Sequence, residues 1–332
     1  MADIVDVHTH LYPPLYLDAL GERTENPRVA GRTGDDGLFM IFPGDAGRPV
    51  TDAYWSLDTK VAFMDRHGIT TSVVSLGNPW LDPFEAGHST DLARKLNEEF
   101  ASFEGRTGGR VLGMGCLPNA PVETVTEVIA EIAARPSLYG VVSGTRLAGK
   151  VFDDPELEPV WAALETHGVP LLVHPHYGVG VEEMSGYGHS LPLALSFPFE
   201  TSLALSKLAM CGALARHPGL RIIASHGGGT LPFLAGRLDG CWRPDPAALI
   251  RHDAPPSASL AKLYFDALVY NPRALRATAD LAGTDKMVFG TDHPFEIADP
   301  ATNLAAIDQV FPDAADRDRV LGANARTLFG RP

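Results

Sequence analysis

The N-terminal stretch Asp3-Ile4-Val5-Asp6-Val7-His8-Thr9-His10 joins a run of apolar and β-branched residues to two histidines. The composition of this run predicts a short buried strand. Because residues i and i+2 of a strand point to the same face, the Cα atoms of His8 and His10 would lie about 6.5 Å apart, which lets both imidazoles bind one metal ion. A histidine-rich turn would give the same sequence, so a metal site here depends on support from the rest of the chain.

Strand-like and helix-like segments alternate after this stretch. We expect seven more strands, at residues 71–76, 110–117, 140–143, 170–174, 221–226, 264–269 and 286–290. Helical patterns flank them, at residues 57–67, 91–106, 122–135, 155–167 and 200–217, from about 231, and at 317–329. Eight apolar strands, each followed by helical material, predict an α/β fold, a (β/α)8 TIM barrel in preference to a doubly wound sheet. We expect one domain over residues 1–332, with active-site loop insertions at about 11–52 and 175–196.

The composition limits the partners of the protein. The chain has 332 residues, of which 45% are hydrophobic, and a formal net charge of −14. This charge argues against nucleic acid or an anionic membrane as the main partner. No apolar stretch has membrane-spanning length, and the first residues lack the basic and apolar regions of a signal peptide. Cys116, Cys211 and Cys241 are far apart and odd in number, which indicates reduced thiols in a cytoplasmic protein.

Histidine or aspartate stands at the end of four predicted strands, and in a (β/α)8 barrel these ends share one mouth. The residues are His8 and His10, His174 with His176, His226, and Asp292. Each could instead have a structural role, as a strand cap, a core histidine or a turn cap. As a group they predict a metal site for one divalent ion, Zn²⁺ in preference to Mn²⁺, with an open coordination position. Its expected ligands are His8, His10, His174 and Asp292.

His226 is the candidate for an acid/base or orienting group without a metal ligand role. The reason is the sequence Gly227-Gly228-Gly229, which follows it directly. Glycines without a Cβ atom would let a substrate approach the backbone closely at this point.

Five motifs extend these observations over nearly the whole chain. They are His8-Thr9-His10, Leu172-Val173-His174-Pro175, Phe199-Glu200-Thr201, Ser225-His226-Gly227-Gly228-Gly229-Thr230-Leu231-Pro232-Phe233 and Gly290-Thr291-Asp292-His293-Pro294-Phe295. As a set they resemble the amidohydrolase superfamily and, within it, the aminocarboxymuconate-semialdehyde decarboxylase family. The resemblance implies the barrel fold and the metal ligands given above, with His226 in the catalytic pocket.

A narrower similarity is to isoorotate (uracil-5-carboxylate) decarboxylase. It rests on His8-Thr9-His10-Leu11-Tyr12-Pro13-Pro14, Ser75-Leu76-Gly77-Asn78-Pro79-Trp80, His174-Pro175-His176-Tyr177-Gly178 and Tyr187-Gly188-His189-Ser190-Leu191-Pro192-Leu193-Ala194-Leu195. The semialdehyde decarboxylases tend to have Trp in place of His176 and Tyr in place of His293, which favours the isoorotate branch. Binuclear hydrolases of the superfamily often use a carbamylated lysine on the fourth strand. Here that strand ends in Val141-Val142-Ser143-Gly144-Thr145, and its nearest lysine is Lys150, so we expect a mononuclear site.

The resemblance also implies substrate-binding residues. Arg48 matches the arginine that holds the substrate carboxylate, Asn78 and His176 match positions that contact the substrate ring, and Phe295 matches an aromatic wall. Arg237 matches an arginine that reaches the active site of a neighbouring subunit, which implies a homodimer or a higher homo-oligomer. Without the resemblance, Arg48 could be a solvated loop residue, Asn78-Pro79 a turn, and Arg237 a surface charge.

The implied activity is the non-oxidative decarboxylation of a small cyclic or unsaturated carboxylic acid, with release of CO₂. Isoorotate, an aminocarboxymuconate semialdehyde and an ortho-hydroxybenzoate are the candidate substrates. The alternatives are a metal-dependent hydrolase or lactonase, a hydratase, and a metal-binding protein without catalytic activity. Asp292, or a metal-bound water assisted by His226, would deliver the proton.

Overall fold

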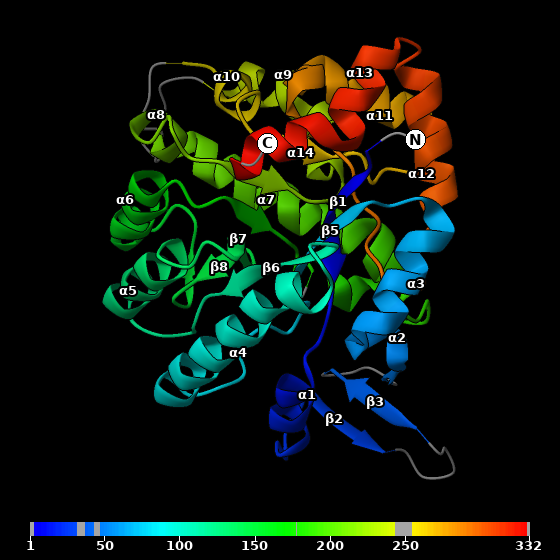
Figure 1. Ribbon diagram of the computed structural model, residues 1–332. Helices are drawn as coiled ribbons and strands as arrows, with labels where there is room; N and C mark the ends of the chain where they lie inside the picture. The colour runs from blue at the N-terminus through cyan, green and yellow to red at the C-terminus, as the bar shows by residue number, and fades with distance from the viewer. Residues whose placement is uncertain (1–2, 32–36, 43–46, 177, 243–253, 331–332) are drawn as a thin grey trace.

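Eight parallel strands form the centre of the molecule and pair in the order β1-β5-β6-β7-β10-β11-β12-β13 (Figure 1). Their bounds are β1 Val5–His10, β5 Thr71–Ser75, β6 Val111–Cys116, β7 Leu138–Ser143, β10 Leu171–Val173, β11 Ile222–Ala224, β12 Tyr264–Asp266 and β13 Met287–Val288. A parallel bridge between Asp6 and Phe289 joins the last strand to the first. Apart from a few end residues, the strands are buried, as expected for parallel strands covered by helices. The predicted (β/α)8 barrel is therefore confirmed.

The computed structural model describes residues 3–31, 37–42, 47–176, 178–242 and 254–330. Tyr177, which belongs to one of the quoted motifs, lies outside these residues, as does part of the segment 11–52. No helix within the described ranges is long and apolar enough to cross a membrane. The three cysteines form no disulfide, in agreement with the prediction of unpaired thiols.

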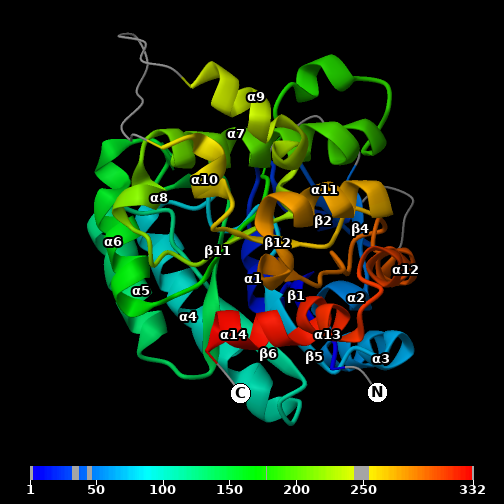
Figure 2. The same cartoon turned by 90° about the horizontal axis from the view of Figure 1, so that it is seen from above.

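Helices cover the outside of the barrel (Figure 2). In chain order they are α3 Leu57–His67, α4 Ala86–Arg106, α5 Val122–Ala133, α6 Glu158–His167, α7 Phe197–Met210, α8 Ala213–Arg216, α9 Leu231–Cys241, α10 Pro256–Leu260, α11 Pro272–Ala282, α12 Pro300–Val310, α13 Ala314–Asp318 and α14 Asn324–Phe329. In α5, for example, Val125, Val128, Ile129 and Ile132 are buried. This spacing forms one apolar stripe that packs toward the strands.

Two predicted helices are interrupted in the structure. The helix predicted over residues 200–217 is divided into α7 and α8, because Gly212 adopts a left-handed conformation with φ 80° between them. Glycine adopts this conformation without the steric cost that a Cβ atom would bring. The helix predicted over residues 317–329 includes a π-helical turn at Arg319–Ala323, which precedes α14.

The expectation that residues 11–52 form an irregular loop is wrong for most of the part that the structure describes. This segment contains the helix α1 (Pro14–Gly21) and a small antiparallel sheet of β2 (Arg28–Gly31), β3 (Leu38–Ile41) and β4 (Arg48–Val50). The short helix α2 (Asp52–Trp55) follows. The sheet lies beside the barrel rather than in it (Figure 1). A short hairpin of β8 (Arg146–Leu147) and β9 (Lys150–Val151) follows β7.

The second long segment, residues 175–196, has little regular structure where it is described. It contains a 3-10 helix at Val181–Met184 and a π-helical turn at Pro192–Ser196. Both long segments contribute side chains to the cavity described below.

Candidate active site

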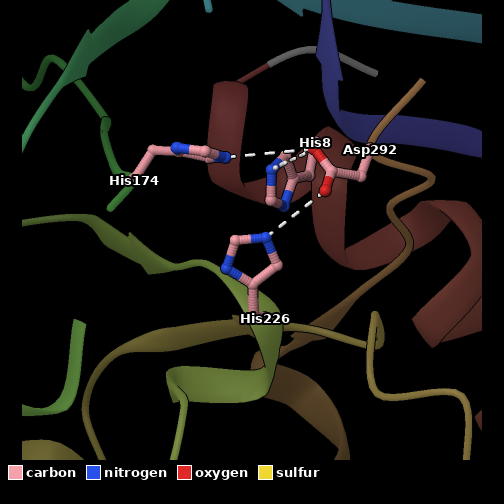
Figure 3. Close-up of side chains that lie close together, drawn as sticks. All are labelled: His8, His174, His226 and Asp292. Carbon is pink, nitrogen blue, oxygen red and sulfur yellow. Dashed lines mark ion pairs between the residues drawn. The ribbon is translucent and has the colours of Figure 1, made fainter. Parts of the chain in front are cut away.

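Four predicted strand-end residues meet at the carboxyl ends of the strands, as Figure 3 shows for three of them together with His226. Asp292 lies at the centre of the group. Its Oδ1 atom is 3.4 Å from His8 Nε2, 3.3 Å from His10 Nε2 and 3.9 Å from His174 Nε2. Two ligand atoms that each lie about 2.1 Å from a tetrahedral Zn²⁺ are roughly 3.4 Å apart. The spacing of these four side chains therefore suits a common metal ion.

The hydrogen bonds of the histidines leave their Nε2 atoms directed at this centre. His8 Nδ1 is 2.5 Å from Asp266 Oδ2, and His174 Nδ1 is 2.9 Å from the Pro175 carbonyl oxygen. Since a carboxylate and a carbonyl oxygen only accept, both Nδ1 atoms must donate. His10 Nδ1 is 3.0 Å from Ser75 Oγ. Fixing a ligand through its other ring nitrogen is the usual arrangement around protein-bound metals.

The buried atoms at the centre have no hydrogen-bond partner among the described residues. They are His8 Nε2, His10 Nε2, His174 Nε2 and Asp292 Oδ1. Leaving one buried polar atom unsatisfied costs about 1–3 kcal/mol, and four at one point would be unfavourable without a ligand. Three imidazole nitrogens and one carboxylate oxygen are donors that a divalent transition metal prefers.

The charges of the group also suit a cation. Burial would raise the pKa of Asp292, but its contacts with four histidines hold the pKa well below the usual range. Burial lowers the pKa of His10 to about 4 and the pKa of His174 well below its usual value. Asp292 is therefore charged at neutral pH, and these two imidazoles are neutral, as metal ligands must be.

His8 differs from the other histidines. Burial acts to lower its pKa, but the carboxylates of Asp266 and Asp292 outweigh burial and raise the pKa to about 10. The two acids thus favour a positive charge at this position. A metal ion bound at Nε2 would supply that charge in place of a proton.

Asp266, at the end of β12, is a site residue that the sequence interpretation missed. Besides His8 Nδ1, its carboxylate accepts the backbone N–H groups of His226 at 2.9 Å and Gly227 at 2.7 Å. Burial would raise the pKa of Asp266, but these contacts hold it below its usual value. The available signal was an aspartate inside an apolar strand, where an acid is rare without a partner.

His226 approaches the other carboxylate oxygen of Asp292. Its Nε2 atom is 3.5 Å from Asp292 Oδ2, whereas His8, His10 and His174 approach Oδ1. The ligating atoms of His226, His8, His174 and Asp292 all lie within 4.8 Å of one another. His226 is thus close enough to exchange a proton with Asp292, or to join the metal ligands.

The role predicted for the glycines after His226 is wrong. A Cβ atom at Gly227 would collide with Val269, and one at Gly228 would collide with Phe265. Gly227, Gly228 and Gly229 all have positive φ, between 60° and 74°. These glycines are needed for close packing against the protein itself, not for the approach of a substrate.

A cavity of about 430 Å³ opens beside the cluster and is lined by His174, His226 and Asp292. Three of the predicted substrate-binding residues line the same cavity: Arg48, Asn78 and Phe295. The Arg48 guanidinium lies 4.9 Å from the centre of the Phe42 ring and 5.4 Å from that of Phe295. Because Arg48 belongs to β4, the small sheet places a cation at the mouth of the barrel.

Asn78 lines this cavity and carries an acceptor without a partner in the described part of the chain. Its Nδ2 atom donates to the His176 carbonyl oxygen at 3.4 Å. Because a carbonyl oxygen only accepts, the amide nitrogen of Asn78 must face it. This contact fixes the orientation of the amide group and so the position of Oδ1. Asn78 Oδ1 is buried and has no hydrogen-bond partner among the described residues.

Two predicted substrate-binding residues lie elsewhere. His176 stacks on Trp80 with a ring distance of 4.8 Å, and its Nε2 is 3.3 Å from Asp82 Oδ2. It lines a neighbouring cavity of about 310 Å³ rather than the one beside Asp292. Arg237 is exposed on α9 and lines neither cavity. Their predicted roles remain predictions.

The fold and the site define a (β/α)8 barrel with a histidine and aspartate cluster for a divalent metal. A sequence profile of the amidohydrolase family matches residues 5–331, and the chain belongs to this family. Over 345 aligned residues it is 27% identical to the 2-amino-3-carboxymuconate-6-semialdehyde decarboxylase of Dictyostelium discoideum, covering 98% of this chain and 91% of that one.

Several solved structures are similar over the full length, among them two decarboxylases. The isoorotate decarboxylase (IDCase) of Metarhizium anisopliae, in its apo form, superposes with a TM-score of 0.92 and 35% identity, covering 99% of this chain and 97% of that one. The 5-carboxyvanillate decarboxylase of Novosphingobium aromaticivorans, complexed with manganese and 4-hydroxy-3-methoxy-5-nitrobenzoic acid, gives a TM-score of 0.83 at 20% identity, covering 99% and 96%. At this lower identity the second comparison shows the shared fold alone.

The contacts of Asp266 give a test of the metal site. We predict that Asp266→Asn weakens Zn²⁺ and Mn²⁺ binding about 10- to 100-fold, because the amide no longer provides a charged acceptor for His8 Nδ1. Affinity would be measured by competition with a chromophoric chelator. Asp313→Asn is the matched control, since Asp313 caps α13 through the N–H groups of Ala315 and Asp316. Equal affinity of the two variants would contradict the role of Asp266.

Proposed function

We propose that this protein is a metal-dependent, non-oxidative decarboxylase, a carboxy-lyase that acts on a small cyclic carboxylic acid. The observation that carries the proposal is the cavity, in which the Arg48 cation shares one space with His226 and Asp292. This reaction needs a cation that holds the substrate carboxylate and a pair of groups that transfer a proton. The full-length similarity to decarboxylases supports this function over hydrolysis.

In the proposed reaction the bond from the substrate carbon to its carboxylate is replaced by a bond to hydrogen. A proton adds to the carbon, and the electron pair of the breaking C–C bond returns to the ring as CO₂ leaves. A divalent metal on the four ligands would supply a Lewis acid and a template for the substrate oxygens. We propose Zn²⁺, which suits three imidazoles and one carboxylate, with Mn²⁺ as the alternative because a related decarboxylase binds manganese.

The side chains divide the remaining work. Arg48 orients the substrate through a charge-assisted, bidentate contact, and Phe295 provides an aromatic wall. We assign the proton transfer to His226 and Asp292, whose nearest atoms are 3.5 Å apart. We propose that His176 acts on the substrate ring only through Asn78, because its carbonyl oxygen accepts the Asn78 amide N–H.

We propose an isoorotate-like acid as the substrate. Asn78 Oδ1 is an acceptor without a partner, and a ring N–H of a carboxylated pyrimidine would satisfy it. The proposal also rests on the 35% identity to the Metarhizium isoorotate decarboxylase. An aminocarboxymuconate semialdehyde and 2,6-dihydroxybenzoate are the comparison substrates.

The decisive experiment measures CO₂ release and ultraviolet absorbance with these three acids. We predict turnover of 5-carboxyuracil, its loss after chelation and its recovery with Zn²⁺ or Mn²⁺. In D₂O the product should carry one deuterium at the former carboxylate carbon, and in H₂¹⁸O it should gain no ¹⁸O. Incorporation of ¹⁸O would indicate a hydrolase, and full activity of metal-free protein would exclude the metal role.

Arg48 gives the second functional prediction. Arg48→Met should raise KM roughly 10- to 100-fold for carboxylated substrates, because a hydrogen bond to a charged group contributes about 1.5–3 kcal/mol. Arg48→Lys keeps the charge but not the planar fork, so an intermediate KM is expected. Arg28→Met is the matched control, since Arg28 belongs to the same small sheet but does not line the cavity. An unchanged KM in Arg48→Met would refute the assignment.

We further propose a homodimer in which Arg237 of α9 reaches the active site of the neighbouring subunit. Phe233, one helical turn before Arg237 and so on the same face, is 88% exposed. Phe199 and Leu203 of α7 are 40% and 49% exposed. Ser202 Oγ accepts the N–H of Thr230, at the start of α9, so α7 and α9 are neighbours. Together these apolar side chains suit an interface between two copies.

This interface can be tested by the mass in solution. We predict that Phe233→Asp shifts the protein from dimer to monomer in analytical ultracentrifugation, because a charge would replace the aromatic ring that the proposed interface covers. Leu38→Asp, which changes an exposed residue of β3, should leave the mass unchanged. Arg237→Ala should remain dimeric and lose substrate affinity. A wild-type chain that is monomeric would overturn the interface and the role of Arg237 together.

A further inference from the structure

Lys60 is a fully buried lysine that the proposed reaction does not use. It projects from α3, and its Nζ atom lies 2.7 Å from Thr9 Oγ1 and 2.6 Å from His293 Nδ1. The His293 carbonyl oxygen is 3.4 Å from the same nitrogen. Burying an amino group is costly unless its hydrogen bonds are satisfied. The position of Lys60 therefore calls for an explanation beyond packing.

The partners of Lys60 belong to the two segments that carry most of the metal ligands. Thr9 stands between His8 and His10 on β1, and His293 directly follows Asp292. Lys60 thus touches neither the cavity nor the ligands, but it contacts the neighbours of three ligands.

The backbone around these contacts is already paired across the same junction. His10 N–H donates to the His293 carbonyl oxygen at 2.7 Å, and Asp292 N–H donates to the His8 carbonyl oxygen at 2.8 Å. The Thr9 hydroxyl donates to the His293 carbonyl oxygen at 3.1 Å. Lys60 adds a side-chain link to this junction, so a shift of the Asp292 turn along β1 would break several bonds together.

Asp292 also has a backbone conformation that needs support. Its φ is 60°, in the left-handed region that a non-glycine residue adopts at a cost of about 1–2 kcal/mol. The His293 ring packs on Phe63 of α3 with a centre distance of 3.8 Å. Lys60 and Phe63 together therefore hold the residue after Asp292 from the same helix.

The far end of the turn has a matching link. Asp6 of β1 accepts the Thr291 N–H at 3.1 Å and the Thr291 hydroxyl at 2.7 Å.

Burial lowers the pKa of Lys60 to about 7, and the Asp6 and Asp292 carboxylates oppose that effect. The amino group can donate both as an ammonium and as an amine, so the link does not depend on its charge.

We propose that Lys60 is a positioning residue for the metal centre. Its amino group fixes the turn of Asp292 against β1, so that Asp292 Oδ1 meets the histidine Nε2 atoms before a metal ion binds. The inference rests on the metal site of the proposed function and adds a residue that touches neither metal nor substrate. A purely structural Lys60 would contribute to stability and leave metal affinity unchanged.

The test compares metal affinity with thermal stability. Lys60→Met keeps the length and most of the volume of the side chain and removes its hydrogen bonds. We expect Zn²⁺ affinity of the purified chain, measured by chelator competition, to fall about 10- to 100-fold. We also expect the rise in Tm on adding Zn²⁺ to become smaller. Circular dichroism would confirm that the barrel is folded.

Asn324→Ala is the matched control. Asn324 is a buried residue that donates to the carbonyl oxygens of Thr284 and Met287, at the opposite end of β13. It should lower the Tm and leave Zn²⁺ affinity unchanged. Wild-type affinity in Lys60→Met, or an equal loss of affinity in Asn324→Ala, would overturn the inference.

Thr9→Val gives a second test that does not depend on the folding of Lys60→Met. It removes the hydroxyl through which Lys60 contacts β1 and keeps the side-chain shape. We expect weaker Zn²⁺ binding in Thr9→Val, and a smaller loss when Lys60→Met is added to it than when Lys60→Met is made in the wild-type chain. Unchanged affinity in Thr9→Val would overturn the inference. A wild-type chain that binds no metal would instead overturn the metal site of the proposed function.

Discussion

The approach of three imidazole nitrogens to one carboxylate oxygen, Asp292 Oδ1, is the interaction on which the site depends. His8 and His10 come from the first strand of the barrel and Asp292 from the end of the last. Only closure of the barrel, through the bridge from Asp6 to Phe289, brings these ends together. A doubly wound sheet with the same strands would leave its first and last elements apart. The site therefore requires a closed barrel, and the metal that it suits would in turn stabilise closure.

A second set of buried polar groups holds the side chains of the site in place. The Nδ1 atoms of His8, His10 and His174 are occupied by Asp266, Ser75 and the Pro175 carbonyl, respectively. These partners fix the ring orientations, so the Nε2 atoms have little freedom to turn away. Lys60 contacts Thr9 and His293, the residues next to His8, His10 and Asp292, rather than these side chains themselves. Precise placement of the ligands thus depends on buried polar contacts that never reach the substrate.

The sequence predicted those parts of the site that follow from local periodicity. His8 and His10 could be placed because a strand repeats every two residues, and His174, His226 and Asp292 because each follows an apolar run. Lys60 could not, since a lysine in an amphipathic helix usually faces solvent. Asp266 lies within an apolar run, but its contacts with His8 and with the backbone of His226 and Gly227 exist only in the tertiary structure. The sheet of β2, β3 and β4 was missed because its strands are only three or four residues long and the segment is rich in Gly and Pro. The glycines after His226 were misinterpreted because their close neighbours, Val269 and Phe265, lie far along the chain.

The two groups of residues around the cavity come from different parts of the fold. The histidines and Asp292 belong to the barrel strands, whereas Arg48 belongs to the small sheet outside it, and His189 to the segment before α7. A change in either outer segment would alter what the cavity accepts without disturbing the contacts around Asp292. The reverse does not hold, because Asp292 is hydrogen-bonded to the backbone of His8, Asp266 to the His8 ring, and Lys60 to Thr9 and His293 beside them. Substrate preference can therefore vary on a fixed metal centre, which explains how one barrel can suit acids as different as a carboxylated pyrimidine and a hydroxybenzoate.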